Sequence, residues 1–378
     1  MAREVSIGAQ GFEQMRLQNA FLVDKTDFIA QWWNSLDHIT LICRPRRFGK
    51  TLTLDMVRCF LSLEFSGRGE ELFGDLAIWK NEHMQTLQGT TPVVMLSFAD
   101  CKGSTLDESL ASIRQVIRMT VESHSYLYDS THITTNDHIF LDRVTDDMDI
   151  ITATSSIKQL CLMLKKHWGI EPVVLLDEYD TPLQEAWLGG YWDGMSAFMR
   201  KLFNSTFKSN KDLRRALITG ITRVASESIF SDLNNPAVIT TTTPQYQNFF
   251  GFTKDEVADA LREFGAQNEL DNVCKWYDGF TFGNKNEMFN PWSITCYLQW
   301  SRLKPYWANS SSNSLVGELI RQGGNELKTD FDKLLAGDSV RRQVNEFVSY
   351  RTLRYDSNAV WSLLLATGYL RVAGHDDN

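Results

Sequence analysis

The chain has 378 residues, 43% of them hydrophobic and 22% charged, which is typical of a folded globular protein of two domains. Its 38 basic and 47 acidic residues give a net charge of −9, which argues against a protein whose main task is to coat nucleic acid. Six isolated cysteines, no signal peptide and no apolar run of membrane-spanning length predict a cytoplasmic protein with reduced thiols.

Predicted strands alternate with predicted helices over residues 1–250. Apolar runs predict strands at 38–43, 93–98, 172–176 and 215–221, and a run of β-forming residues predicts a fifth at 238–242. Helical spacing of apolar residues predicts helices at 50–63, 106–117, 156–168 and 191–207. Residues 124–155 lack either period and are interpreted as an insertion or a long loop. The alternation predicts an α/β fold, with a parallel sheet covered by helices on both faces.

From about residue 251 the pattern changes, because helical spacing predominates. Helices are predicted at 253–264, 270–277, 291–300, 314–321, 326–335 and 359–366. We therefore place a domain boundary near residue 250. The α/β domain at 1–250 is followed by a mainly helical region at 251–378.

The segment 44–51 reads Arg-Pro-Arg-Arg-Phe-Gly-Lys-Thr and lies between the first predicted strand and the first predicted helix. It matches the phosphate-binding P-loop, Gly-x-x-x-x-Gly-Lys-Ser/Thr, except that Arg44 replaces the first glycine. Gly49 would let the backbone approach phosphate, and Lys50 would place a charge on the β- and γ-phosphates of ATP. The alternative is an ordinary strand–turn–helix with a surface lysine. We expect the nucleotide contacts to come from Arg46, Arg47, Phe48, Gly49, Lys50, Thr51 and Leu52.

The apolar strand at 172–176 runs into two adjacent acids, Asp177 and Glu178. In P-loop ATPases the first such acid supports Mg²⁺, together with the hydroxyl that follows the lysine, and the second activates the attacking water. We therefore predict a metal site at Thr51 and Asp177, with Glu178 as the catalytic base. The alternative is a pair of acids in a solvated loop. The guanine motif of GTPases is absent, because 253–256 ends in glutamate rather than aspartate, so ATP is the predicted nucleotide.

With these two motifs the chain resembles the bacterial AAA-ATPase-like family, whose members often carry a C-terminal nuclease domain of the PD-(D/E)XK type. The matching segments are 23–26, 44–51, 177–183, 220–223, 231–235, 251–256, 277–280, 290–293 and 364–370. The resemblance implies a P-loop core of the additional-strand type, with the phosphate-loop strand in the centre, a helical lid and nucleotide-driven switching. The family tolerates arginine at position 44. Its nuclease half would follow Leu370, so we expect this chain, which ends at Asn378, to lack it.

Further residues have more than one interpretation. Arg223 follows the strand after the acidic one, where ATPases place a catalytic group that senses the γ-phosphate, although a surface arginine is the alternative. Arg46 and Arg47 would add charge beside the triphosphate, face a partner or form a solvated turn. Asp180 would orient the P-loop lysine or cap the next turn. By family analogy 24–25 would lie near the adenine, and otherwise they belong to a helix cap.

The predicted function is Mg²⁺-dependent binding and hydrolysis of ATP that drives a conformational switch, in a bacterial system linked to nucleic acid or defence. The alternative is an ATP-bound signalling or scaffold module that hydrolyses little; a P-loop kinase would need an acceptor pocket that we cannot identify. We expect a protein partner or a homo-oligomer and no membrane association, and the net charge does not support nucleic-acid binding. Nuclease activity is not expected, because the Glu-x-Lys match at 326–328 has helical rather than strand spacing.

Overall fold

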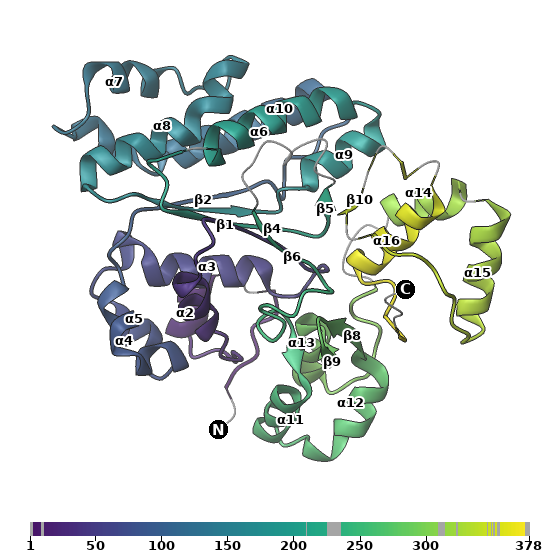
Figure 1. Cartoon of the computed structure of the whole chain (residues 1–378). Coiled ribbons are helices and arrows are strands. Elements are labelled where there is room, and N and C mark those ends of the chain that lie inside the picture. Colours follow the sequence, from purple (N-terminus) through teal and green to yellow (C-terminus); the bar gives the residue numbers. More distant parts are fainter. Residues whose placement is uncertain are drawn as a thin grey trace.

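The computed structural model describes residues 3–8, 11–208, 210–224, 236–308, 314–322, 324–345, 347–348, 350, 352–353 and 356–374, so the matching segment 231–235 lies outside it. Over these residues five parallel strands form one sheet: β1 (Ile39–Cys43), β2 (Val93–Ser97), β3 (Val173–Asp177), β4 (Arg215–Gly220) and β6 (Ala237–Ile239). Their order is β2-β3-β4-β1-β6 (Figure 1). β4 thus lies between β1 and β3, which is the additional-strand arrangement that the resemblance implied. The middle strand is β4, however, and not the phosphate-loop strand β1.

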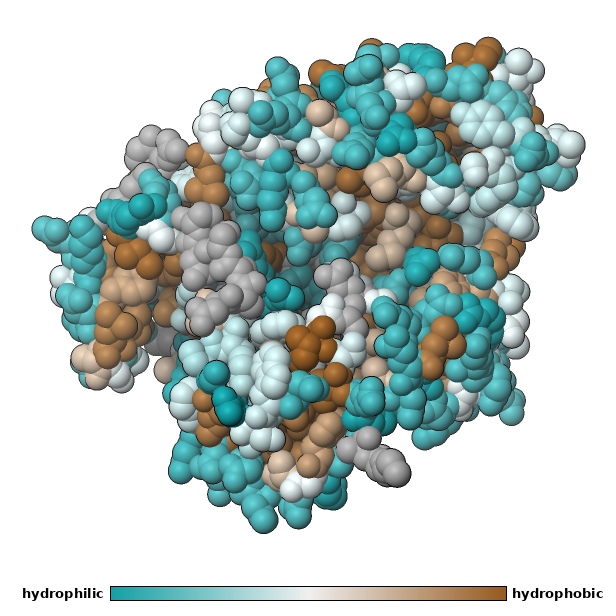
Figure 2. Space-filling model, turned by 180° about the vertical axis from the view of Figure 1, so that it is seen from behind, coloured by the Kyte–Doolittle hydropathy of each residue, from teal (hydrophilic) through white to brown (hydrophobic). Residues whose placement is uncertain are grey.

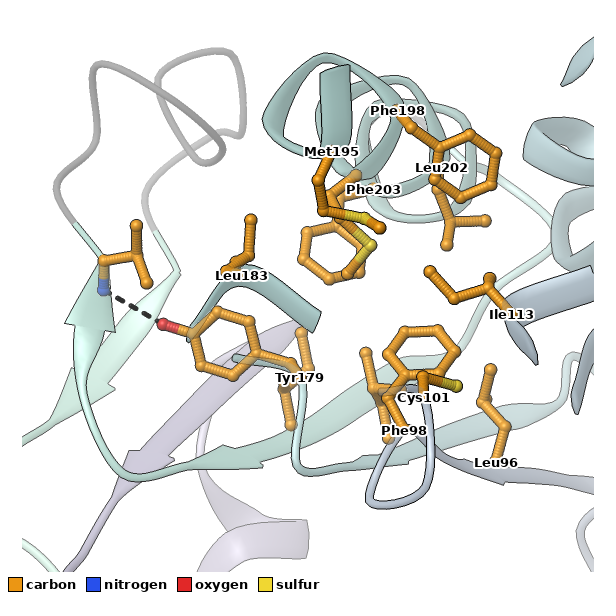
Figure 3. Packing of buried hydrophobic residues seen from close by; sticks show 14 of the residues in the cluster. Leu96, Phe98, Cys101, Ile113, Tyr179, Leu183, Met195, Phe198, Leu202 and Phe203 are labelled. Atoms are coloured by element: carbon orange, nitrogen blue, oxygen red, sulfur yellow. Dashed lines mark hydrogen bonds between the residues drawn. The ribbon is translucent and has the colours of Figure 1, made fainter. Parts of the chain in front are cut away.

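Helices cover both faces of this sheet (Figure 1). One face carries α6 (Leu106–Glu122), α8 (Ile150–Trp168), α9 (Thr181–Gly189) and α10 (Trp192–Phe207). The other face carries α1 (Phe12–Leu17), α2 (Asp27–Asn34), α3 (Lys50–Leu61), α4 (Gly69–Phe73) and α5 (Glu82–Leu87). Side chains alternate along each strand, so Val174 of β3 joins the core on the first face and Leu175 joins the core on the second. Figure 3 shows the first core, where Phe98, Ile113 and Met195 lie close together. The predicted α/β fold is confirmed.

Residues 124–155 are more regular than the sequence suggested. They contain the 3-10 turn η3 (Ser125–Asp129), helix α7 (Thr135–Asp142) and the first turns of α8. α7 begins with a capping box, in which the side chains of Thr134 and Asp137 each accept a hydrogen bond from the other's backbone amide. Asp149 caps α8, but Ile150 and Ile151 in its first turn are exposed, so the apolar period is broken there. The segment is therefore not a long loop, and that alternative was wrong, whereas its interpretation as an insertion stays a prediction.

The C-terminal region is mainly helical, as predicted, but it also contains a small antiparallel sheet. Its helices are α11 (Lys254–Glu263), α12 (Leu270–Tyr277), α13 (Pro291–Trp300), α14 (Ser314–Gln322), α15 (Asn325–Leu335) and α16 (Ser357–Thr367). Among the described residues, β7 (Phe252–Thr253), β9 (Lys285–Phe289) and β8 (Asp278–Phe282) form a three-stranded sheet in that order. We did not predict this sheet, although Gly283, which has a φ of 55°, and Asn284 between β8 and β9 are a hairpin signal.

A short parallel pair joins the two parts of the chain: β5 (Arg223–Val224) from the α/β part and β10 (Phe347–Val348) from the C-terminal region. Seen from behind, the surface is mostly hydrophilic and is hollowed between these two parts (Figure 2). The Glu-x-Lys match at 326–328 lies on α15, in agreement with its helical spacing. In the part of the chain that the structure describes, no helix has the length and hydropathy to cross a membrane.

Candidate active site

The phosphate-loop sequence connects β1 to α3, and Lys50 is the first residue of α3. Gly49 immediately before it has a φ of 79°, and Arg47 also has a positive φ of 67°. Glycine adopts this left-handed conformation without strain, so a larger residue at position 49 would be disfavoured. Gly49 also has no side chain that could accept a hydrogen bond from the first amides of α3. Those amides are the groups with which helix N-termini bind phosphate.

Lys50 is buried within the loop. Its Nζ donates hydrogen bonds of 2.9 Å to the carbonyl oxygens of Arg44 and Pro45. Burial lowers the pKa of its ammonium group, and the carboxylates of Glu178 and Asp177 act against that shift. The lysine of the phosphate loop therefore lies within electrostatic reach of the two acids at the end of β3.

Asp177 and Thr51 come together from segments 126 residues apart. The Thr51 hydroxyl donates a hydrogen bond of 2.6 Å to Oδ2 of Asp177, and the hydroxyl of Thr219 on β4 donates to Oδ1. Asp177 is only 2% exposed, and burial raises the pKa of its carboxyl group. A hydroxyl oxygen and a carboxylate oxygen are the ligands that Mg²⁺ prefers, so this pair fits the predicted metal site.

Glu178 has a left-handed backbone, with a φ of 50°. This conformation is unfavourable for glutamate by about 1–2 kcal/mol, and such outliers concentrate at functional sites. Its Oε2 accepts a hydrogen bond of 3.0 Å from the Thr181 hydroxyl, which restricts the orientation of the carboxylate. The backbone turn at Glu178 also directs the next two residues, Tyr179 and Asp180, into the interior, where both are fully buried.

Asp180 binds the segment that follows β4. Its Oδ2 accepts hydrogen bonds from the amides of Ile221 and Thr222, at 3.0 and 2.9 Å. Its side chain makes no capping bond to α9, which it precedes, and among the hydrogen bonds of the described residues it has none with Lys50. Neither role that we expected for Asp180, orienting the lysine or capping the next turn, is its main contact. Asp180 instead ties the end of β3 to the segment that leads to Arg223.

Tyr179, like Asp180, connects the end of β3 to the segment that follows β4. Its hydroxyl donates a hydrogen bond of 2.6 Å to the carbonyl of Thr222. It also accepts one of 3.0 Å from the amide of Val224, the dashed line in Figure 3. Its ring lies against Gly220, where a Cβ atom would be 2.5 Å from a ring carbon. The segments 177–180 and 220–224 are therefore one packed unit, and glycine is required at the contact.

Arg44 explains why the P-loop pattern is broken at its first position. The side chain is fully buried, and Nη1 donates to the carbonyl oxygens of Cys43, at 3.1 Å, and of Thr240. Its guanidinium lies 4.7 Å from the ring centre of Phe282, and burial lowers its pKa to about 10. Arg44 thus fixes the base of the loop to the end of β6 and to the β8–β9 hairpin, where glycine would leave a void.

Three residues at the tip of the loop contact the C-terminal region. The guanidinium of Arg47 lies 4.6 Å from the ring centre of Trp292. Phe48 is buried between Phe280 and Phe282, with ring centres at 4.7 and 5.1 Å. Arg46, whose charge also acts on Lys50, accepts a hydrogen bond of 3.2 Å at its carbonyl from the indole of Trp307. Leu52 of α3 is partly buried and packs its side chain against the core, so its backbone amide is the group suited to phosphate.

Arg223 lies on β5, which follows the carboxyl end of β4 in the chain. It lines a cavity of about 20 Å³, together with Cys43, Thr240 and Ser362 of α16. That volume is enough for about one water molecule. The structure therefore places the predicted sensor beside the C-terminal region as well as beside the end of β1.

The segment 23–26 has structural contacts. Asp24 accepts hydrogen bonds from the amides of Thr26 and Ala77, at 2.9 and 2.7 Å. Lys25 pairs with Glu256 of α11, with Nζ at 2.5 and 2.7 Å from the two carboxylate oxygens. Burial lowers the pKa of this lysine. The N-terminal cap of α2, Thr26, makes no side-chain capping bond, so the contacts of Asp24 and Lys25 instead join this segment to Ala77 and to α11.

Comparisons with known proteins bear on this site. A family model described as predicted AAA-ATPase matches residues 6–230. A protein of Azotobacter chroococcum mcd 1, described as an uncharacterized protein in the vnfD 5′ region, is 25% identical over 331 residues, which is 85% of this chain and 56% of that protein. The chain thus spans little more than half the length of that relative. The Walker-type ATPase paby2304 of Pyrococcus abyssi is similar at a TM-score of 0.41 and 12% identity, over 85% of this chain and 77% of that chain.

Proposed function

Since this chain belongs to the AAA-ATPase-like family, we propose that it binds ATP with Mg²⁺, hydrolyses it, and changes conformation with the nucleotide state. The observation that carries the proposal is the 2.6 Å hydrogen bond between Thr51 and Asp177. It brings the phosphate loop and the acidic strand end together with the two oxygen types that hold Mg²⁺ in such sites.

Lys50 is the proposed phosphate ligand. In the structure the carbonyls of Arg44 and Pro45 accept two hydrogen bonds from its ammonium group, which carries three donors. A bound triphosphate would accept those donors in place of the carbonyls. Burial disfavours the charged form of Lys50, and a nearby anion stabilises that form. The phosphates of ATP would supply such an anion, so the buried ammonium group favours their binding.

Thr51 and Asp177 are the proposed holders of Mg²⁺. When bound, Mg²⁺ would supply positive charge that stabilises the oxygens of the transferred phosphoryl group. Asp177 must be deprotonated to bind a cation, and burial raises its pKa. The hydroxyls of Thr51 and Thr219 oppose that shift by donating hydrogen bonds to the charged carboxylate.

Glu178 is the proposed general base. Its carboxylate would accept a proton from the water that attacks the γ-phosphate, a role that contributes about 10²–10⁴-fold to a rate. The hydrogen bond from Thr181 holds the carboxylate in one orientation. Arg223 is proposed as the group that senses the γ-phosphate, and its strand pairs with β10 of the C-terminal region.

The setting of this activity is also a proposal. The resemblance to the family favours a cytoplasmic bacterial protein in a system linked to nucleic acid or defence. A protein partner or a second copy of the chain would receive the conformational change. In the competing candidate the chain binds ATP and hydrolyses little. The hydrogen bonds that Lys50 donates to the loop carbonyls favour that candidate, because they must be exchanged for phosphate contacts each time a new ATP binds, which would slow turnover.

The test of the proposal combines calorimetry and phosphate release. Purified chain is titrated with ATP in the presence of Mg²⁺ and again with EDTA, and phosphate release is then measured at saturating Mg-ATP. Mg²⁺-dependent binding with turnover supports the ATPase. Binding without turnover supports the ATP-bound module, and no binding contradicts both.

A further inference from the structure

Asn290 connects the C-terminal region to the phosphate loop with both ends of its amide group. It follows β9 and caps α13, because its Oδ1 accepts a hydrogen bond of 3.1 Å from the amide of Ser293. Its Nδ2 donates to the carbonyl oxygens of Arg46 and Arg47, at 3.4 and 3.2 Å. The residue is only 2% exposed, so water competes little for these bonds.

These two carbonyls determine where the next amides point. In a planar trans peptide the C=O and the following N–H point in opposite directions. Fixing the carbonyl of Arg46 therefore fixes the amide of Arg47, and fixing the carbonyl of Arg47 fixes the amide of Phe48. Both amides belong to the set that we expect to contact the phosphates. Because the carbonyls point toward Asn290, the amides point away from it.

The backbone at this point needs such support. Arg47 has a φ of 67°, a left-handed conformation that disfavours a residue with a side chain by about 1–2 kcal/mol. Strain of this kind persists only where the surroundings enforce it. Asn290 provides two hydrogen bonds to this turn, and Trp292, two residues later, stacks on the Arg47 side chain.

We propose that Asn290 is a positioning residue for ATP binding, which holds the phosphate loop in its binding conformation and couples nucleotide binding to the docking of α13. This inference rests on the proposed function. Because the coupling is reciprocal, ATP stabilises the docked α13 as much as docked α13 favours ATP. The C-terminal region thereby senses the nucleotide through the backbone of the loop, in addition to any contact with the ligand itself.

The test uses the substitution Asn290→Ser in the whole chain. Serine keeps the cap of α13, since it is as good a helix cap as asparagine, but it is too short to reach the loop carbonyls. Binding of a non-hydrolysable ATP analogue with Mg²⁺ is measured by calorimetry. We expect the dissociation constant to rise about tenfold, the effect of losing one or two hydrogen bonds. Asn290→Asp, which keeps the size and the cap but donates nothing, should weaken binding at least as much.

The matched control is Asn81→Ser. Asn81 caps α5 through hydrogen bonds from the amides of His83 and Met84, at 3.1 and 3.3 Å, and has no part in the phosphate loop. This variant should bind the analogue as the wild type does. In the wild type the analogue should slow hydrogen exchange in α13, and in Asn290→Ser that protection should be reduced.

The outcomes separate the two claims. If the wild type binds no nucleotide, the proposed function fails and this inference fails with it. If the wild type binds but Asn290→Ser binds equally well and shows the same protection of α13, the proposed function stands and the positioning role of Asn290 is wrong. Weakened binding in Asn290→Ser and Asn290→Asp, with unchanged binding in Asn81→Ser, supports the inference.

Discussion

The hydroxyl of Thr51 lies 2.6 Å from Oδ2 of Asp177, so the phosphate loop and the acidic end of β3 share a hydrogen bond. The contact crosses β4, which separates β1 from β3 in the sheet and contributes Thr219 to the same carboxylate. A metal site between two non-adjacent strands depends on this arrangement.

The first prediction concerns Asp177→Asn. Burial raises the pKa of Asp177, so the folded protein keeps this proton to a higher pH than the unfolded chain does. The group therefore stabilises the fold below its ordinary pKa, and that contribution is lost as the pH rises through the folded pKa. At neutral pH the charged carboxylate is a cost to stability. Asp177→Asn should raise the melting temperature without nucleotide and should abolish the effect of Mg²⁺ on ATP binding, both measured by calorimetry.

The second prediction concerns pH. Lowering the pH should weaken Mg-ATP binding before ordinary carboxyl groups are protonated, because Asp177 gains its proton at a higher pH than an exposed aspartate. The measurement is the dissociation constant for Mg-ATP in a pH series, with Asp177→Asn as the reference. A wild-type pH profile identical to that of the variant would show that Asp177 does not bind the metal.

The third prediction concerns Lys50→Ala. The variant loses the buried cation of the loop, and hydrogen bonds of charged groups contribute about 1.5–3 kcal/mol each. Affinity for Mg-ATP should fall by about two orders of magnitude or more. The matched control is Lys201→Ala, which removes an exposed lysine on α10. Unchanged affinity in Lys50→Ala would rule out the phosphate-loop assignment.

The fourth prediction concerns Gly220→Ala. A Cβ at this position would lie 2.5 Å from the ring of Tyr179. That ring is fully buried, and its hydroxyl is hydrogen-bonded to the carbonyl of Thr222 and to the amide of Val224, so it has little freedom to move away. The free energy of unfolding should fall by about 1–3 kcal/mol, the usual effect of overpacking. Gly317→Ala on α14 is the control, because no atom lies within 4 Å of the added Cβ. Equal stability of the two variants in urea would contradict the packed unit described here.

The sequence was most informative where the signal is local. β1 and β3 are buried along their whole length and appear as continuous apolar runs, and the positions of all five strands of the sheet were predicted to within a few residues. The phosphate loop and the acids after β3 follow short motifs whose chemistry is known. Both parts of the site were therefore predictable before the structure.

The contacts between distant segments were not predictable in this way. Asn290 and Arg46 are 244 residues apart, and no period or spacing relates them. Asp180 was expected to orient Lys50 or to cap the next turn, whereas its carboxylate accepts hydrogen bonds from backbone amides 41 and 42 residues later. In the sequence Arg44 was a mismatch to the P-loop pattern, and the structure explains it by the hydrogen bond of its side chain to the carbonyl of Thr240. In each case the partner is set by the topology of the sheet and by the packing of the C-terminal region.

The most direct test of the account is phosphate release from Mg-ATP by the wild type and by Glu178→Gln. Glutamine keeps the size of the side chain but cannot accept the proton from water. The variant should bind Mg-ATP with wild-type affinity and release phosphate ~10²-fold or more slowly, the scale of general-base loss. Turnover at the wild-type rate in Glu178→Gln, or no turnover in either protein, would contradict the claim that the chain is an ATPase with Glu178 as its base.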